Sequence, residues 1–155
     1  MGHPLEWPIC IKKAGVKIVA SAKVDISYNK ISRICTLDDL TVILFPINKL
    51  HQKVFLAIFI ELKYASDQFL PSLFPLCEKY GFTPRTLETV RSKMRRMGII
   101  DHVCRFNRSC GYREGWVFSN RFSRALVLLS KTTENMRRKK DDLQKRKDYD
   151  LFSYF

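Results

Sequence analysis

Two glycines, Gly81 and Gly98, enclose the segment that constrains the fold of this chain most strongly. Thr83-Pro84 opens it, and this pair is typical of a helix start, because a threonine side chain caps free N–H groups and proline suits the first helical position. Apolar residues recur inside it at helical spacing: Leu87, Val90, Met94 and Met97. The sequence therefore predicts an amphipathic helix over 83–97, ended by Gly98.

Further elements follow from the same kinds of pattern on both sides of this helix. They are a helix over 51–64, a short helix over 73–80 capped by Ser72 with Pro75 at its third position, strands over 99–106 and 112–118 around a loop at 107–111, and a helix from about residue 121 capped by Ser119 or Asn120. The segment 50–130 is therefore expected to combine helices with a β-hairpin.

Residues 1–48 predict a β-rich extension instead. Short β-branched runs at 16–20 and 23–28 predict strands, and Asn29-Lys30 predicts a two-residue hairpin turn before a returning strand over 31–36. The run 41–47 predicts another strand. The paired carboxylates Asp38-Asp39 are expected to cap or turn between strand segments.

The order helix, short helix, tight turn, helix, β-hairpin and helix resembles the winged helix-turn-helix family of DNA-binding domains, and MarR-type regulators in particular. The closest part is 71–100, with its glycine turn, threonine cap, basic helix end and terminal Gly98-Ile99-Ile100. The resemblance is one of pattern. It covers about residues 50–130 and implies a winged helix-turn-helix domain over 49–130. With the β-rich extension over 1–48 and a long basic C-terminal helix with an aromatic tail over 131–155, the expected fold class is α+β.

The resemblance implies duplex DNA as the partner and transcription regulation as the role. The face of helix 83–97 opposite its apolar stripe is polar and basic. Residues expected near base edges in the major groove are Arg85, Thr86, Thr89 and Lys93, and those expected near phosphates are Ser92 and Arg96. A surface helix with solvated charges is the alternative.

The predicted hairpin loop would be the wing of such a domain. The segment 105–113 contains Arg105, Arg108 and Arg113, and a wing places arginine in or across the minor groove, where the potential is most negative. Arg108 is expected at the tip. A basic hairpin that contacts nothing is the alternative.

The last part of the chain is strongly basic. Leu126, Leu129, Met136 and Leu143 continue from Phe122 with heptad-like spacing, which predicts a dimerisation helix over 131–147 and a homodimer. A basic arm on DNA and a frayed helix are alternatives. The aromatic residues of 149–155 are expected to dock on the chain's own core or on a second protomer.

The net charge of +13 is concentrated in residues 83–155, which carry +10 of it. Such an excess favours a polyanion, either nucleic acid or an anionic membrane surface. The longest uninterrupted apolar run, 54–60, is far shorter than the roughly 20 residues that span a bilayer. The first eight residues lack the basic and apolar regions of a signal peptide. We therefore expect an intracellular, cytoplasmic or nucleoid-associated protein without a membrane partner.

The cysteines and histidines predict neither a metal site nor a catalytic site. His102, Cys104 and Cys110 come nearest to a metal-ligand set, but their spacing fits no zinc motif. No phosphate-binding glycine motif or catalytic constellation is present. The expectation is a non-enzyme without cofactor, and the sequence names no small-molecule effector. Two other functions stay open: a nucleic-acid binder without sequence choice (a replication, chromatin or RNA protein) and a winged-helix module for protein–protein interaction.

Overall fold

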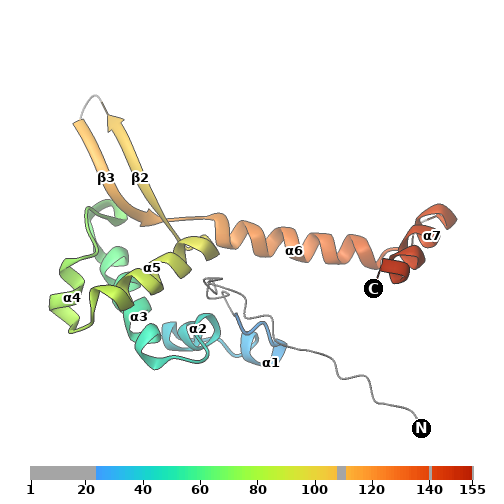
Figure 1. Ribbon diagram of the computed structural model, residues 1–155, viewed down its shortest axis with the longest axis horizontal. Coiled ribbons are helices and arrows are strands. Elements are labelled where there is room, and N and C mark those ends of the chain that lie inside the picture. Colours follow the sequence, from blue (N-terminus) through green and yellow to red (C-terminus); the bar gives the residue numbers. More distant parts are fainter. Residues whose placement is uncertain (1–23, 108–110, 140, 155) are drawn as a thin grey trace, which may run out of the picture.

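The structure is a computed structural model that describes residues 24–107, 111–139 and 141–154. It is α+β, with a helical body, a long β-hairpin and a helix that leaves the body in another direction (Figure 1). In chain order the elements are α1 (Tyr28–Ile31), α2 (Leu37–Leu44), α3 (Lys49–Tyr64), the 3-10 turn η1 (Ser66–Gln68), β1 (Phe69–Leu70), α4 (Pro75–Tyr80), α5 (Pro84–Met97), β2 (Ile100–Asn107), β3 (Gly111–Phe118), α6 (Arg121–Arg137), α7 (Asp142–Asp150) and the 3-10 turn η2 (Leu151–Tyr154). No helix within these described ranges is long and apolar enough to span a membrane.

The centre of the core is α3. Asn48 caps its start by accepting the N–H groups of Leu50 and His51, at 2.9 and 3.1 Å. The apolar face of α3 is fully buried and packs mainly on α5 and α2. Burial of each leucine, isoleucine or phenylalanine on that face stabilises the folded state by about 1.5–3 kcal/mol relative to leaving the side chain exposed. The predicted helices over 51–64 and 83–97 are confirmed as α3 and α5.

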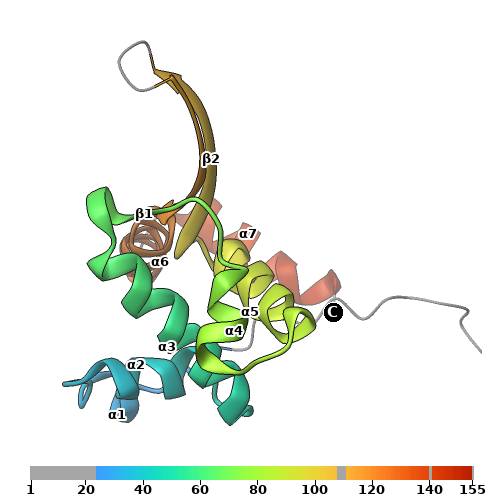
Figure 2. The ribbon, with the colours of Figure 1, turned by 90° about the vertical axis from the view of Figure 1, so that its left-hand side faces the viewer.

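The predicted hairpin is confirmed, and a short third strand joins it. The sheet order is β1-β3-β2, and both pairings are antiparallel. Gly115 allows β1 to come close, because a Cβ there would lie 2.4 Å from the carbonyl oxygen of Leu70. The hairpin curves away from the helices, so its far end stands clear of the body (Figure 2).

The prediction of a β-rich N-terminal extension is wrong for residues 24–48, where the structure has two helices and no strand. Asn29-Lys30 lies inside the single turn of α1 instead of a hairpin turn, and most of the run 41–47 belongs to α2 or follows it directly. The predicted strand over 16–20 lies outside the described residues.

A capping box explains the helix that replaces the expected strand. Thr36 Oγ1 accepts the N–H of Asp39, and the Asp39 carboxylate accepts the N–H of Thr36 at 2.9 Å. The Asp39 carboxylate also accepts from the Thr36 hydroxyl at 2.8 Å, and this bond, followed by those from the N–H groups of Cys35 and Thr36, holds the pKa of Asp39 below its usual range. Asp38-Asp39 therefore begins a helix, and the cap outweighs the β-branched residues Thr41, Val42 and Ile43.

The short helix α4 begins later than predicted. Ser72 Oγ accepts the N–H of Phe74 at 3.2 Å, but the helix starts at Pro75, which therefore takes the first helical position and not the third. Gly81 ends α4 in the left-handed conformation, with φ of 69°. The α4–turn–α5 arrangement otherwise follows the prediction.

The single long C-terminal helix is a second correction. The helix α6 ends at Arg137, Arg138 is extended, and a new helix begins when Asp141 accepts the N–H of Gln144. The predicted heptad therefore stops before Leu143. Arg137 and Lys140 have i,i+3 spacing in the sequence, so one continuous helix would bring their like charges together on one face, which disfavours it.

Candidate nucleic-acid interface

The N-terminal end of α5 uses two of its threonines for capping. Thr83 Oγ1 accepts the N–H of Thr86 at 3.3 Å, and the two hydroxyl oxygens lie 2.8 Å apart. Thr86 is half-buried. Its hydroxyl therefore supports the helix start, and it does not stand on the outer face with Arg85.

The outer face of α5 exposes Arg85, Glu88, Thr89 and Arg96. Thr89 Oγ1 donates to the carbonyl oxygen of Arg85 at 2.9 Å, so the same oxygen can still accept a hydrogen bond. Half-buried Ser92 donates to Glu88 Oε1 at 3.1 Å. The face is therefore polar and offers both donors and acceptors, with one carboxylate among its cations.

Lys93 departs from this face. Its Nζ lies 4.2 Å from the centroid of the Phe45 ring, at the end of α2. Burial lowers the pKa of Lys93, and burial together with Lys93 lowers the pKa of His51 in α3. Lys93 thus lies beside the helical body and apart from Arg85 and Thr89, with which the sequence grouped it.

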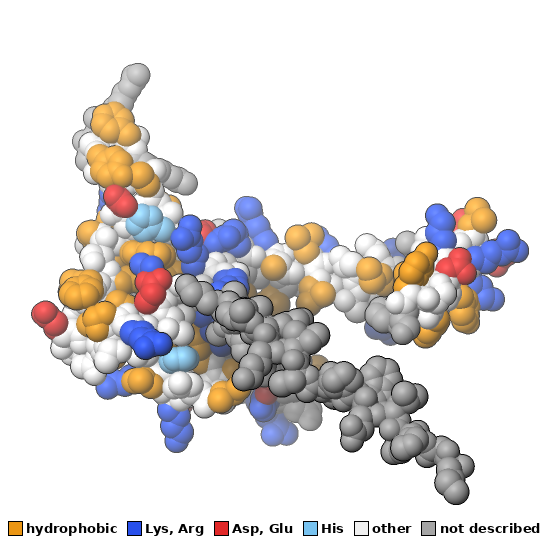
Figure 3. All heavy atoms as spheres, in the orientation of Figure 1, with side chains coloured by type: hydrophobic (Ala, Val, Ile, Leu, Met, Phe, Trp, Pro, Cys, Tyr) orange, Lys and Arg blue, Asp and Glu red, His pale blue; other side chains and the backbone are white. Residues whose placement is uncertain are grey.

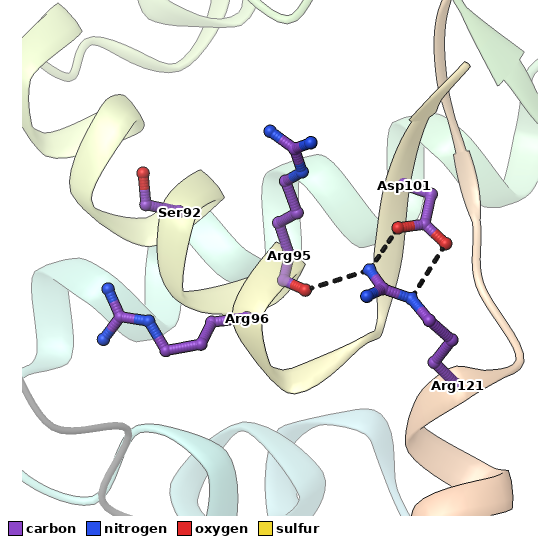
Figure 4. Close-up of a pocket in the computed structure, with 5 residues that line it drawn as sticks. All are labelled: Ser92, Arg95, Arg96, Asp101 and Arg121. Carbon is purple, nitrogen blue, oxygen red and sulfur yellow. Dashed lines mark hydrogen bonds and ion pairs between the residues drawn. The ribbon is translucent and has the colours of Figure 1, made fainter.

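A basic pocket opens where α5 meets α6 (Figure 4). Its volume is about 420 Å³, and its lining residues are Ser92, Arg95, Arg96, Asp101 and Arg121. The side chains of Arg95 and Arg96 extend from the end of α5 in different directions, while Arg121 turns toward Asp101 (Figure 4). We call these five residues the basic pocket.

Arg121 holds the basic pocket together. Its guanidinium makes two contacts with the Asp101 carboxylate, one of them from Nε at 3.2 Å, and also donates to the carbonyl oxygen of Arg95 at 3.2 Å. Burial alone would raise the pKa of Asp101, but hydrogen bonds from Ser119 and Arg121 hold it below its usual range. The lining residues of the pocket include three arginines and a single carboxylate, that of Asp101, so the lining as a whole is basic.

One face of the hairpin is tied to the body by Arg113. Its guanidinium lies 3.3 Å from Asp67 Oδ2 and 4.1 Å from the centroid of the Phe69 ring. Arg105 is paired in register with Arg113, and Arg108 lies outside the described residues. Of the three predicted wing arginines, the structure therefore shows Arg113 engaged with the chain's own β1 region.

The other face of the hairpin contains a chain of polar contacts. Tyr112 Oη lies 2.7 Å from Cys104 Sγ and donates to Glu114 Oε2 at 3.1 Å, and these two hydrogen bonds raise the pKa of Tyr112 to about 12. Glu114 Oε1 lies 3.5 Å from His102 Nε2. Within the described part of the chain, no three His, Cys, Asp or Glu residues are placed to hold a metal ion. Cys110 lies outside it.

Three arginines of this region were not among the predicted site residues. Arg95 and Arg121 belong to the basic pocket, and Arg91 lies 4.9 Å from the centroid of the Trp116 ring while pairing with Glu88. Arg95 could have been predicted, because helical spacing places it beside the polar face of the predicted helix. Arg121 could not have been predicted, because its role depends on how α6 meets the end of α5.

Lys and Arg side chains gather around the junction of α5 and α6 on the face seen in Figure 3. The structure thus brings the outer face of α5 together with the basic pocket, while Lys93 and Arg113 contact the body. Comparisons of the chain with protein-family models, with curated proteins and with solved structures found no match.

Proposed function

We propose that the protein binds duplex DNA through a winged helix-turn-helix arrangement and regulates transcription. In this proposal α4 and α5 are the helix-turn-helix, α5 enters the major groove, and the β2–β3 hairpin is the wing. Arg85 and Thr89 contact base edges, and Ser92, Arg95 and Arg96 contact phosphates. The proposal includes no catalytic step, cofactor or membrane partner, and it places the protein inside the cell, on DNA.

One observation carries this proposal: the exposed polar face of α5 continues into the basic pocket. A helix that reads DNA needs side chains with hydrogen-bonding ends toward the bases and cations toward the flanking phosphates. Arg85 and Thr89 supply the first, and Arg95 and Arg96 supply the second. A helix that merely faced solvent would not need a pocket of arginines at its end.

A homodimer is part of the proposal. None of the residues of α6 is buried, although the helix carries several large apolar side chains, so its apolar side needs a partner. Phe122 at the start of the helix packs against the core, and Leu126, Leu129 and Met136 continue the same side of the helix at i+4, i+7 and i+14 from it. A second copy of α6 could cover this side, because in a two-fold dimer the same apolar surface of each protomer packs against the other.

A selection from random duplexes with the purified protein tests the proposal, followed by binding of variants to the selected duplex. We expect Arg85→Ala and Thr89→Ala each to lose about 1–3 kcal/mol on the selected duplex and much less on random duplex. Lys53→Ala is the matched control, since it removes an exposed cation from α3. Affinity should fall steeply with salt because phosphates are neutralised.

Two outcomes would favour the other functions. Equal losses on selected and random duplexes would indicate a nucleic-acid binder without sequence choice. Absence of binding, or an affinity that does not change with salt, would leave an interaction module that uses the same fold for a protein partner.

A further inference from the structure

One carboxylate stands on the outer face of α5, which is otherwise polar or basic. Glu88 lies three residues after Arg85 and directly before Thr89, and all three side chains are exposed. A carboxylate repels phosphates, so at this position it lowers the affinity of the helix for any duplex. Glu88 therefore needs contacts that offset this cost.

Arg91 balances the charge of Glu88 and holds its side chain. A guanidinium nitrogen of Arg91 pairs with Glu88 Oε2, and Ser92 Oγ donates to Glu88 Oε1 at 3.1 Å. Arg91 is itself half-buried, and its guanidinium carbon lies 4.9 Å from the centroid of the buried Trp116 ring in β3. The carboxylate is thus held by two partners on α5, and one of them is anchored against the hairpin.

The Glu88 carboxylate keeps acceptor capacity for a base. Its two oxygens offer about four lone-pair positions, and the contacts with Arg91 and Ser92 occupy one on each oxygen. The Glu88 side chain is 56% exposed in spite of these contacts. In the major groove only cytosine and adenine present donors, and the adenine donor stands beside the N7 acceptor, which repels a carboxylate. The carboxylate is therefore best matched to cytosine.

We propose that Glu88 is a specificity-determining residue that accepts a hydrogen bond from the N4 amino group of cytosine. Arg91 is a positioning residue, because it holds the carboxylate without contacting the base. The proposal rests on the proposed function, sequence-specific reading of duplex DNA by α5, and adds the base that one position of the site carries. The carboxylate also rejects thymine at that position, because it would face the O4 acceptor of thymine.

Selections from random duplexes with full-length wild type and with Glu88→Gln test the proposal. We expect the wild-type motif to contain a cytosine that the Glu88→Gln motif replaces by adenine, since glutamine bonds to adenine N6 and N7. Replacement of this C·G pair by T·A should weaken wild-type binding about tenfold and Glu88→Gln binding much less. Glu78→Gln, which removes an exposed carboxylate from α4, is the matched control and should keep the wild-type motif.

Arg91→Met tests the positioning role. The variant keeps the Glu88 carboxylate but removes its guanidinium partner, and methionine can still pack against the Trp116 ring. We expect the ratio of affinities for the C·G and T·A duplexes, measured by fluorescence anisotropy, to fall several-fold. Loss of one cation or of folding stability would not change this ratio, because both affect the two duplexes equally.

The outcomes separate this proposal from the proposed function. An unchanged motif for Glu88→Gln, with tighter binding to every duplex alike, would show that Glu88 only repels phosphates and would overturn this proposal alone. An unchanged affinity ratio for Arg91→Met would overturn the positioning role of Arg91. A wild type that selects no motif would overturn the proposed function as well.

Discussion

A Cβ atom added at Gly98 would lie 2.7 Å from the Cβ of Arg121, closer than two such carbons can approach. The backbone of Gly98 also has φ of 80°, a left-handed conformation that favours glycine. Its carbonyl oxygen accepts the N–H of Phe122 at 3.0 Å. The end of α5 and the start of α6 are therefore in direct backbone contact.

We expect Gly98→Ala to destabilise the fold by about 3 kcal/mol or more, because backbone strain and steric conflict add. Gly81→Ala is the control: Gly81 has a similar φ of 69°, but a Cβ there meets nothing within 4 Å. That substitution should cost only the backbone strain, about 1–2 kcal/mol. Urea denaturation of both variants measures the difference, and equal losses would contradict the steric argument.

Acid should weaken the contact between α3 and α4. Glu61 accepts from Lys79 Nζ and Tyr80 Oη, both at 2.5 Å, and these bonds, that of Lys79 first, lower the pKa of Glu61. A carboxyl whose pKa is lower in the folded state adds stability above its unfolded pKa of about 4.3 and loses it as pH falls through the folded value.

Glu61→Gln should therefore flatten the fall in stability below about pH 4.3, with an effect under about 1 kcal/mol because the pair is partly exposed. Glu78→Gln, an exposed carboxylate on α4, is the control. Denaturation midpoints measured across this pH range check the prediction. A Glu61→Gln profile that runs parallel to the wild type would refute it.

The apolar side of α6 should control self-association. Leu129 and Val127 are similarly exposed, 55% and 52%, but they lie on nearly opposite sides of the helix. We expect Leu129→Glu to convert a dimer into a monomer, whereas Val127→Glu leaves the dimer intact. Analytical ultracentrifugation measures both, and a wild-type monomer would remove the dimer from the proposed function.

The position of Lys93 predicts a titration effect on a histidine. Burial and, after it, the nearby Lys93 ammonium lower the pKa of His51. Lys93→Met removes the second cause, so the pKa of His51 should move up toward its ordinary value while remaining below it. An NMR titration of the His51 ring protons measures the shift, with Lys53→Met as control.

The same variant separates Lys93 from the DNA-reading face. Because the Lys93 ammonium lies against Phe45, we expect Lys93→Met to change DNA affinity much less than Arg85→Ala does. A loss as large as that of Arg85→Ala would show that Lys93 turns outward when DNA binds.

Local sequence signals correctly predicted the elements whose ends are marked by capping residues, proline or glycine. Thr83-Pro84 and Gly98 fixed α5 to the residue, and the two apolar runs around the loop at 107–111 fixed the hairpin. The prediction of strands over 24–48 was wrong because it followed the β-branched residues. The segment Thr36-Leu37-Asp38-Asp39 contains a capping box, which indicates a helix start. A capping box spans four residues and is a more specific signal than a short β-branched run.

The candidate site was predictable only where one helix defines it. Helical spacing placed Arg85, Thr89 and Arg96 on one exposed face. It could not place Lys93, which lies at the edge of that face and turns toward α2, nor Arg113, whose partners Asp67 and Phe69 are more than forty residues away in sequence. Contacts between distant segments leave no periodic trace in a sequence.

The junction at Gly98 gives the molecule a fixed angle. The carbonyl of Gly98 is bonded to Phe122, and Arg121 is fastened to Asp101 and to the last turn of α5, so α6 has little freedom to swing relative to α5. With 17 residues, α6 extends for about 25 Å at the usual helical rise. In the proposed dimer, the length of α6 and its angle to α5 would therefore set the spacing between the two DNA half-sites.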